Sequence, residues 1–454
     1  MNALKSFLPG VGWPAVPDEH GARVLALLWQ FAQSERWPAE QILAHQLRQL
    51  SPVVAHARQH TRHYRERLVG ADDRPLSTLS QLRALPILTR RDLQDGVESM
   101  SSDFIPPQYG KPVEKRSSGS TGQPVLVRST GLDALIWQAN ALRDHHWHQR
   151  DLSLKLAAIR AFGAGAADPP DGSVARVWGA ASAAVYATGP AALLSLNADS
   201  ATQAAWLIRH QPGYLLTFPN ILARLLDYLE QEKAALPWLR AVLCVGETVT
   251  PLLRQRCRAV LNVSIEDVYS SQELGYIALQ CPVSGQYHVM AESVLVEVLD
   301  VAGNPCAPGE TGRLVISSLH NYAMPLIRYE LGDYATVGNA CTCGRTLPVL
   351  ERIAGRERNM LRLPGGKWRW PVVGVLPYSE VAPVRQFKII QRSLEELEVN
   401  FVTDRDLTDG EEARLGAMII ESLGHPFRLN IACVREDFPR APNGKFEEFV
   451  CAIP

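Results

Sequence analysis

Residues 117–124 read Ser117-Ser118-Gly119-Ser120-Thr121-Gly122-Gln123-Pro124, a run of small and hydroxyl-bearing residues between two segments of β-strand character. The run predicts an ordered loop between strands, because Pro124 and the flanking β-branched residues restrict the backbone. The two glycines permit a positive φ and close backbone approach, and successive N–H groups form a concavity that binds phosphate oxygens. A flexible serine-rich linker is the alternative interpretation of the same residues.

Length and composition set the outer limits of the interpretation. The 454 residues predict two or more domains, because a single hydrophobic core does not grow to this size. The formal net charge of −1 gives no reason to expect nucleic acid or a membrane surface as a partner. The apolar run at residues 24–29 is too short to cross a bilayer and lacks the flanks of a signal peptide. Eight cysteines do not make a disulfide scaffold, so we expect a reducing, cytoplasmic setting.

The pattern of apolar residues predicts an α/β fold with a small unit at its end. Residues 20–70 keep the spacing of two helices, and helices alternate with strands over residues 130–245. Such alternation is typical of a largely parallel sheet with ligands at the carboxyl ends of its strands. Gly246 and Glu247 stand at such an end, directly after the apolar run 239–245. The last hundred or so residues alternate strands with one helix and predict a small α+β unit.

The loop at residues 117–124 is not a Gly-x-x-x-x-Gly-Lys-Ser/Thr phosphate loop, because Gln123 stands where the lysine is required. It resembles the phosphate loop of the adenylate-forming enzymes, the superfamily that includes acyl-CoA synthetases, peptide-synthetase adenylation domains and luciferases. In that superfamily the loop holds the β- and γ-phosphates of ATP. The resemblance assigns this role to the residues Ser117, Ser118, Gly119, Ser120, Thr121 and Gly122.

A second resemblance concerns the N-terminal third of the chain. The segment Leu85-Pro86-Ile87-Leu88-Thr89-Arg90 and the helices before it are similar to the N-terminus of the phenylacetate-CoA ligase family. The resemblance implies a large, multi-subdomain adenylate-forming domain at residues 1–354 and a small, mobile α+β lid domain at residues 355–454. It also implies a hinge near Arg356, which would contact the ribose and phosphate region. The pivot residue of that hinge aligns with Asn359.

Three further superfamily motifs follow in the expected order. The resemblance implies that Tyr269 lines the adenine site and that Glu273 carries the Mg²⁺ that bridges the ATP phosphates, since carboxylate and phosphate oxygens suit this ion. Asp333 would accept hydrogen bonds from both ribose hydroxyls, and Lys445 would contact the acyl carboxylate and the α-phosphate. Without the resemblance, Glu273 would be interpreted as a surface carboxylate, Asp333 as a turn residue and Lys445 as a solvated hairpin lysine.

A set of cysteines and one histidine predicts a metal site. Cys281 and His288 lie just after the Glu273 segment, whereas Cys341 and Cys343 lie just after Asp333, so the four side chains can meet. Three thiolates and one imidazole satisfy tetrahedral Zn²⁺ completely, which is typical of a structural site. The Cys-x-Cys-Gly-Arg-Thr pattern that begins at Cys341 resembles the phenylacetate-CoA ligase branch. Reduced, buried cysteines with a core histidine are the alternative interpretation.

The combined motifs imply an AMP-forming acid–thiol ligase. ATP would activate an aryl or other hydrophobic carboxylic acid as an acyl adenylate, and coenzyme A would then accept the acyl group. One alternative transfers the acyl group to a carrier protein or an amine, and another transfers AMP to a cofactor hydroxyl. A catalytically inactive nucleotide-binding protein is a third alternative, against which Glu273, Asp333 and Lys445 weigh. The implied cofactors are ATP, Mg²⁺, coenzyme A and structural Zn²⁺, and the chain is expected to be a monomer or a homodimer.

Overall fold

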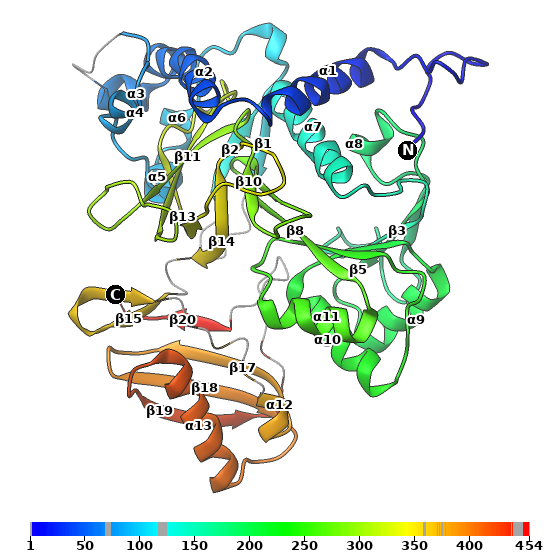
Figure 1. Cartoon of the computed structure of the whole chain (residues 1–454), viewed down its shortest axis with the longest axis vertical. Coiled ribbons are helices and arrows are strands. Elements are labelled where there is room, and N and C mark those ends of the chain that lie inside the picture. The colour runs from blue at the N-terminus through cyan, green and yellow to red at the C-terminus, as the bar shows by residue number, and fades with distance from the viewer. Residues whose placement is uncertain are drawn as a thin grey trace.

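The computed structural model describes most of the chain in ten stretches. These are residues 2–68, 74–116, 125–356, 360–369, 371, 373, 376, 378–436, 438 and 448–453. At residues 356 and 367–369 the backbone alone is described. Figure 1 shows a large part, which contains all elements up to β14, and a smaller C-terminal part below it.

A twelve-stranded mixed sheet forms the centre of the large part. Its strands are β3 (Leu156–Arg160), β4 (Ser173–Ala175), β5 (Ala191–Ser195), β6 (Tyr214–Thr217), β7 (Ala241–Val245), β8 (Ser264–Ser271), β9 (Gly275–Gln280), β10 (Tyr287–Val289), β11 (Val294–Leu299), β12 (Thr311–Ser318), β13 (Tyr329–Val337) and β14 (Val349–Arg356). Their order across the sheet is β11-β12-β13-β14-β10-β9-β8-β7-β6-β3-β5-β4. The five neighbours β8, β7, β6, β3 and β5 run parallel, and the remaining neighbouring pairs are antiparallel.

Helices cover both faces of the parallel half. They are α1 (Glu19–Ser34), α7 (Gly131–Trp147), α8 (Ala180–Ala183), α9 (Ser200–His210), α10 (Pro219–Gln231) and α11 (Pro251–Leu261). Ile159 of β3 packs into the apolar core beneath α9, α10 and α11, whereas Leu156 of the same strand packs on the side of α1 and α7. Successive side chains of a strand point to opposite faces, so this half of the sheet is buried on both sides, as parallel sheets are.

One long helix, several short ones and a hairpin enclose the antiparallel half. They are α2 (Ala39–His60), α3 (Arg62–Arg67), α4 (Leu79–Arg83), α5 (Arg90–Asp95), α6 (Val97–Met100), the 3₁₀ turn η1 (Pro107–Tyr109), and the antiparallel pair β1 (Val113–Arg116) and β2 (Leu126–Ser129). Leu50, Leu82 and Leu88 from these segments are almost fully buried in one core with Ile316 and Tyr329 of the sheet. The first third of the chain is therefore joined to strands more than two hundred residues away.

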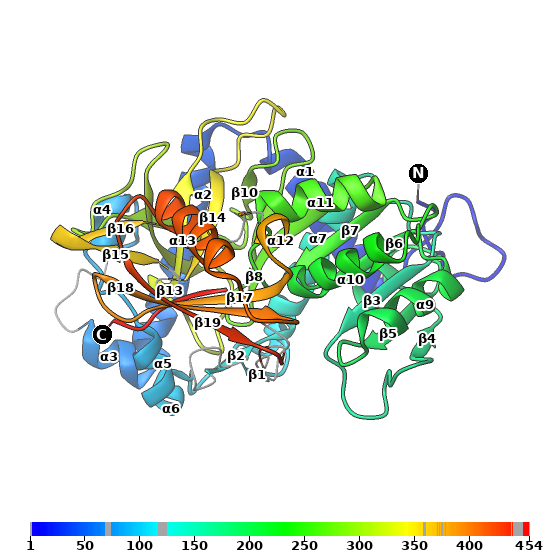
Figure 2. The same ribbon diagram turned by 90° about the horizontal axis from the view of Figure 1, so that it is seen from below.

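The C-terminal part has its own sheet and its own core. Its elements are β15 (Leu361–Leu363), η3 (Pro364–Gly366), β16 (Lys367–Arg369), α12 (Tyr378–Val381), β17 (Val384–Gln391), β18 (Glu396–Thr403), α13 (Asp409–Leu423), β19 (Arg428–Val434) and β20 (Phe449–Cys451). The larger sheet has the order β19-β18-β17-β20. The buried side chains of Leu415, Ile419 and Leu423 anchor α13 on this sheet. Figure 2 shows this sheet and its helix from below.

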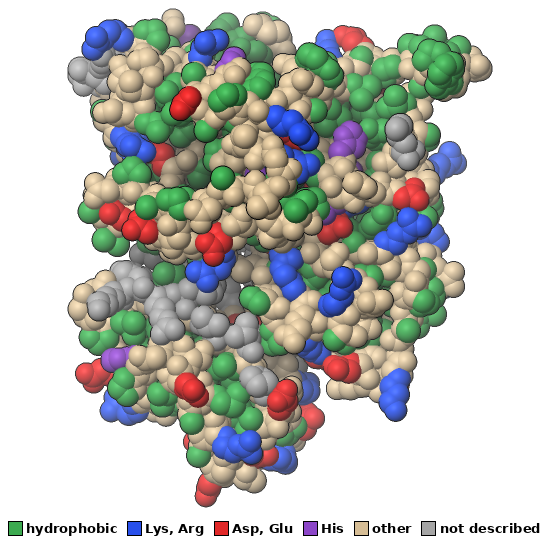
Figure 3. Space-filling model, viewed as in Figure 1, with side chains coloured by type: hydrophobic (Ala, Val, Ile, Leu, Met, Phe, Trp, Pro, Cys, Tyr) green, Lys and Arg blue, Asp and Glu red, His purple; other side chains and the backbone are tan. Residues whose placement is uncertain are grey.

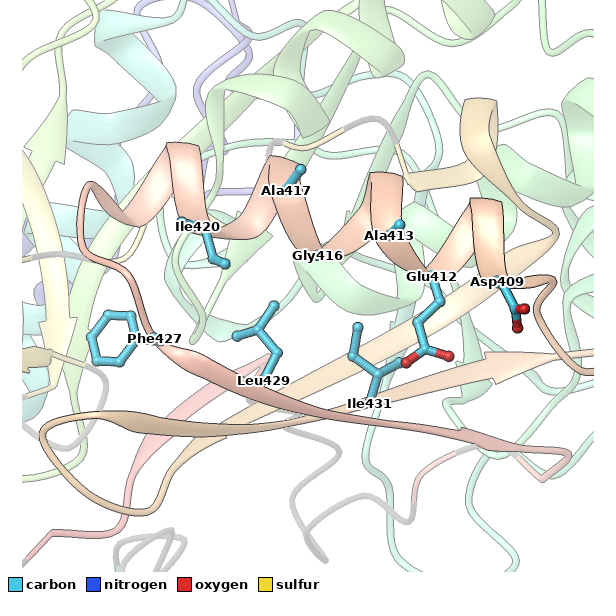
Figure 4. A pocket seen from close by; sticks show the side chains of 9 residues that line it. All are labelled: Asp409, Glu412, Ala413, Gly416, Ala417, Ile420, Phe427, Leu429 and Ile431. Carbon is cyan, nitrogen blue, oxygen red and sulfur yellow. The ribbon is translucent and has the colours of Figure 1, made fainter.

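A groove in the C-terminal part runs between α13 and β19 (Figure 4). It is lined by small, apolar and two acidic side chains of the helix, the latter from Asp409 and Glu412, and by Phe427, Leu429 and Ile431. None of the predicted site residues is among its lining residues, so the groove has no part in the candidate active site. On the face in Figure 3, acidic and basic side chains are interspersed rather than gathered by sign, as the near-zero net charge predicts.

The structure confirms the predicted fold class and corrects one detail. The parallel strands and crossover helices of residues 156–268 occur as predicted, but seven further strands are antiparallel, so the sheet as a whole is mixed. The predicted boundary between residues 354 and 355 falls inside β14 and stays a prediction. Among the helices described, none combines the length and the apolar character needed to cross a membrane.

Candidate active site and metal centre

Tyr269 and Asp333, predicted to bind adenine and ribose, meet in the structure. The Tyr269 hydroxyl donates a hydrogen bond of 2.7 Å to Oδ2 of Asp333. Three strands separate β8 from β13 in the sheet order, so this contact means that the two strands converge on one place. Both side chains are half-buried. Asp333 also lies opposite Arg356 in the β13–β14 register, which brings a third predicted nucleotide residue to the same end of the sheet.

Glu273, the predicted Mg²⁺ ligand, lies in the turn that follows β8 and is nearly inaccessible. Its side chain is 5% exposed, and one carboxylate oxygen lies 3.4 Å from Nη1 of Arg90. The Arg90 side chain is 18% exposed. A carboxylate at this depth is stable as an anion only with a compensating charge, and the Arg90 guanidinium supplies it. A single carboxylate fits Mg²⁺, whose remaining ligands come from phosphate and water, and the predicted role of Glu273 stays a prediction.

The position of Arg90 is fixed by two local features. Thr89 and Asp92 form a capping box that begins α5 directly at Arg90. Leu88 lies beside Tyr329 as a parallel bridge, so the chain before α5 runs along β13. Tyr329 is completely buried. Burial raises the pKa of its hydroxyl, the Glu273 charge raises it further, and Arg90 opposes both, which places the three groups in one cluster.

Gly246 and Glu247 occupy the end of β7, as predicted. Gly246 has a φ of +79°, which a side chain would strain. The Glu247 carboxylate accepts hydrogen bonds from the backbone N–H of Asn220 (3.1 Å) and from its Nδ2 (2.8 Å). The first turn of α10 contains Asn220 and has no side-chain cap of its own, so Glu247 satisfies one of the open N–H groups there. Its predicted contact with a nucleotide stays a prediction.

Several predicted residues lie outside the described part of the chain. These are Ser117, Ser118, Gly119, Ser120, Thr121, Gly122, Asn359 and Lys445, and the side chain of Arg356. The strands on either side of the Ser117–Gly122 loop are described and pair antiparallel, with Arg116 opposite Leu126. The predicted strand–loop–strand arrangement is therefore confirmed in its two strands. The roles of these residues remain predictions.

The four predicted metal ligands do come together. Their ligand atoms, in Cys281, His288, Cys341 and Cys343, all lie within 4.8 Å of one another. The sulfurs of Cys281 and Cys341 are 3.7 Å apart, and Nε2 of His288 is 3.2 Å from the Cys343 sulfur. Two sulfurs that bind one Zn²⁺ tetrahedrally at about 2.3 Å lie about 3.8 Å apart, so the arrangement fits this ion.

The protonation of the cluster also suits metal binding. Burial raises the pKa of the Cys281 thiol, but hydrogen bonds from Ser284 and Val283 outweigh it and set the pKa to about 7. Burial lowers the pKa of His288 to about 4, against an opposing effect of the Leu347 backbone. At neutral pH the imidazole is therefore neutral and one thiol is easily ionised, which are the forms that bind metals.

The residues around the cluster fasten it to the helices of the large part. The ring of Trp147, at the end of α7, meets the His288 ring edge-on at 5.6 Å. The Arg345 guanidinium lies 4.2 Å from the Trp147 ring on another side. The Glu35 carboxylate, just after α1, accepts from Trp147 Nε1 at 3.0 Å and pairs with Arg345 at 3.3 Å. The four ligands thus join the β9–β10 turn and the β13–β14 loop to α1 and α7.

Sequence reasoning missed two contributors to the site, Arg90 and Tyr329. Arg90 lies 183 residues from Glu273 in the chain, and no local pattern marks their contact. The Thr89–Asp92 box predicts a helix that begins at Arg90, but it does not say what the arginine faces. Tyr329 belongs to the same motif as Asp333, but the register shift in this stretch and the positive φ of Gly332 interrupt the alternation of β13, so the motif does not place the two side chains together.

Comparison with known proteins also identifies similarity to AMP-binding enzymes. A model of the AMP-binding enzyme family matches residues 117–324, which include the phosphate-loop motif and Glu273. The phenylacetate-coenzyme A ligase of Escherichia coli (strain K12) is 27% identical over 345 residues, which cover 72% of this chain and 74% of the ligase. The phenylacetate-coenzyme A ligase of Thermus thermophilus is 26% identical over 347 residues, which cover 73% of this chain and 74% of the ligase.

A solved structure extends the likeness of the fold over nearly the whole chain. 2-Hydroxyisobutyryl-CoA ligase in the postadenylation state has a TM-score of 0.73 at 18% identity, with 92% of this chain and 91% of that chain covered. The same ligase in the thioesterification state gives a TM-score of 0.59. The fold of the whole chain therefore superimposes better on the first of these two structures.

Proposed function

From the membership of this chain in the adenylate-forming superfamily of AMP-binding enzymes, we propose that it is an AMP-forming carboxylate–CoA ligase. It activates a carboxylic acid, aryl or otherwise hydrophobic, with ATP and passes the acyl group to the thiol of coenzyme A. The observation that carries the proposal is the meeting of Tyr269 with Asp333, because it brings the two residues that the motifs assign to adenine and ribose to one place in the fold. The similarity to phenylacetate-coenzyme A ligases supports the acid and acceptor.

The first half-reaction joins two anions, so the protein's task is positioning and charge compensation. Asp333 accepts hydrogen bonds from the ribose hydroxyls, and Tyr269 holds its carboxylate in place while lining the adenine site. The loop Ser117–Gly122 holds the phosphates that leave. Lys445 supplies a positive charge beside the α-phosphate and the acid carboxylate. Mg²⁺, which Glu273 would hold, supplies further charge compensation on the phosphates.

The second half-reaction replaces AMP by the thiol. The small part of the chain, from about residue 355, would rotate at Arg356 and Asn359, withdraw Lys445 and open a path for coenzyme A. The likeness to a ligase studied in postadenylation and thioesterification states supports such a rotation. Acyl transfer to a carrier protein or an amine, or AMP transfer to a cofactor hydroxyl, keeps the same first step and is distinguished by the acceptor alone.

The Cys281, His288, Cys341 and Cys343 cluster would hold structural Zn²⁺. All four ligands come from the protein, so the ion has no open position and takes no part in the reaction. Eight free cysteines support the cytoplasm as the setting, since secreted proteins pair their cysteines.

Pyrophosphate exchange across a panel of acids tests the proposal. Labelled pyrophosphate enters ATP only when an acid forms its adenylate, so the acids that support exchange define the substrate class. Aryl acids such as phenylacetate and benzoate should support exchange, and coenzyme A should then release AMP. If no carboxylic acid supports exchange while MgATP still binds, the chain is a nucleotide-binding protein and the ligase assignment fails.

Replacement of Asp333 by alanine should raise the KM for ATP. Two hydrogen bonds to a charged acceptor are lost, and such bonds contribute enough to change an affinity about tenfold to a hundredfold. The measurement is the ATP dependence of pyrophosphate exchange. Asp404→Ala, an exposed carboxylate of the small part, is the control and should leave KM unchanged.

Tyr269→Phe, measured in the same assay, distinguishes the contribution of the Asp333 carboxylate from that of the tyrosine hydroxyl that donates to it. This substitution removes the 2.7 Å hydrogen bond to Asp333 while keeping the aromatic ring, and it should raise KM by less than Asp333→Ala does. An unchanged KM in Asp333→Ala would remove this residue from the ribose site.

A further inference from the structure

The buried ion pair of Arg90 and Glu273 includes a residue, Arg90, to which the proposed function assigns no role. An isolated carboxylate needs a counter-charge, and a purely structural salt bridge would satisfy that need. The pair, however, does not lie in an ordinary core. It stands at the end of β8, with Tyr329 against it and Asp333 four residues further along β13. Arg90 therefore belongs to the same edge of the sheet as the candidate nucleotide residues.

The surroundings of α5 favour the phosphates over the base as the partner of Arg90. Helix α5 contacts both β13 and β2, and β2 follows the predicted phosphate loop in sequence. Arg90 is the first residue of α5, and its guanidinium lies 3.4 Å from the carboxylate of Glu273, the predicted Mg²⁺ ligand.

The charge balance of the site calls for such a group. MgATP remains an anion, and the Glu273 carboxylate adds one more negative charge beside it. Lys445 is assigned to the α-phosphate, on the side of the acid. We propose that Arg90 supplies the positive charge on the side of ATP away from the acid. Its guanidinium binds the β- and γ-phosphates of ATP and the pyrophosphate that leaves. Planar guanidinium groups bind phosphate oxygens through two parallel N–H donors.

The inference rests on the proposed adenylation and adds a residue to it. In that step a carboxylate oxygen of the acid attacks the α-phosphorus, and the bond from this phosphorus to the bridging oxygen breaks. The bridging oxygen leaves with the electron pair as part of pyrophosphate. Arg90 offsets the charge that builds on this leaving group, so its contribution is greater in the transition state than in the bound substrate.

Titration calorimetry with MgATP, magnesium pyrophosphate and AMP tests the inference without an acid substrate. In Arg90→Ala we expect the affinities for MgATP and pyrophosphate to fall about tenfold to a hundredfold, the size of a lost charged hydrogen bond. The affinity for AMP, which has no β- or γ-phosphate, should change by less than about twofold. Arg91→Ala is the matched control, because Arg91 is the next residue of the same helix and its side chain is 88% exposed.

A second comparison asks whether Arg90 binds phosphate itself or acts only through Glu273. In the Glu273→Gln background, removal of Arg90 should weaken pyrophosphate binding again, and Arg90→Lys should restore part of it. If Arg90→Ala has no further effect there, the arginine is a counter-ion of Glu273 and the inference is overturned. Equal losses of AMP and pyrophosphate binding would overturn it too, because they indicate a distorted site.

The calorimetry separates this inference from the proposed function. If the unaltered protein binds neither MgATP nor pyrophosphate, the proposed function fails and the role of Arg90 fails with it. If the unaltered protein binds both ligands and Arg90→Ala behaves like Arg91→Ala, only the role of Arg90 is refuted.

Discussion

Replacement of Lys445 by alanine is expected to abolish acyl-adenylate formation while leaving the thioester-forming step intact. The lysine is assigned to the α-phosphate and the acid carboxylate, where the negative charges of the two substrates meet. Loss of one preorganised donor at such a position lowers kcat by about 10²–10³-fold. Coenzyme A would attack an adenylate that is already formed, in the proposed conformation from which the lysine is withdrawn. The two half-reactions should therefore respond differently to one substitution.

Two assays on the same preparation measure this difference. Pyrophosphate exchange reports adenylation, and release of AMP from a synthetic acyl adenylate and coenzyme A reports thioester formation. Lys388→Ala is the control, because Lys388 lies in β17 of the same small part of the chain and belongs to none of the motifs. Equal loss in both assays would contradict the assigned role, since it would mean that the substitution damages the domain rather than one step.

Helices and strands with a strong local pattern were predictable from the sequence, but the elements against which they pack were not. The apolar face of α10 and the apolar run of β7 each identify an element, because periodicity reports which side of a helix or strand is buried. It does not report what that side is buried against. The antiparallel half of the sheet illustrates this limit: β14 pairs with both β13 and β10, an arrangement set by long-range register that no short segment encodes.

The candidate site shows the same division. Tyr269, Glu273 and Asp333 were found because each belongs to a motif whose order along the chain is informative. Their neighbours were not found, because the contact of Arg90 with Glu273 joins residues 183 positions apart in the chain. Glu247 gives a second example. Its carboxylate accepts hydrogen bonds from Asn220 in the first turn of α10, and the sequence around Glu247 does not predict this contact. The four metal ligands are an exception to this limit. Their grouping was predictable because cysteine and histidine are residue types that commonly bind metals, so their positions in the sequence already indicate a site.

Replacement of Cys341 by serine is expected to cost the protein one bound zinc and much of its stability. The wild-type chain should contain one zinc per molecule, held by three thiolates and one imidazole. Serine is a poor ligand for this ion, and the three remaining ligands would be left close together without their shared counter-charge. A loss of about 3–5 kcal/mol, typical of a buried charge that loses its partner, lowers the Tm of a chain of this size by roughly 3–5 °C.

The structure explains why the effect should spread beyond the four ligands. Without the ion, the β13–β14 loop is no longer fastened to the β9–β10 turn, and Arg345 loses the restraint that holds it on Trp147. Because β13 carries Asp333, which is predicted to bind the ribose, the KM for ATP should rise together with the fall in Tm.

Elemental analysis and thermal unfolding of the same samples measure both consequences. Cys433→Ser is the matched control, since Cys433 lies on β19 in the small part, away from the cluster. It should keep the zinc and the Tm. A wild-type protein that contains no metal and unfolds at the same temperature as Cys341→Ser would show instead that the cluster is four reduced, packed side chains. Restoration of the Tm by added zinc in wild type after chelation, but not in Cys341→Ser, would tie the stability to the ion itself.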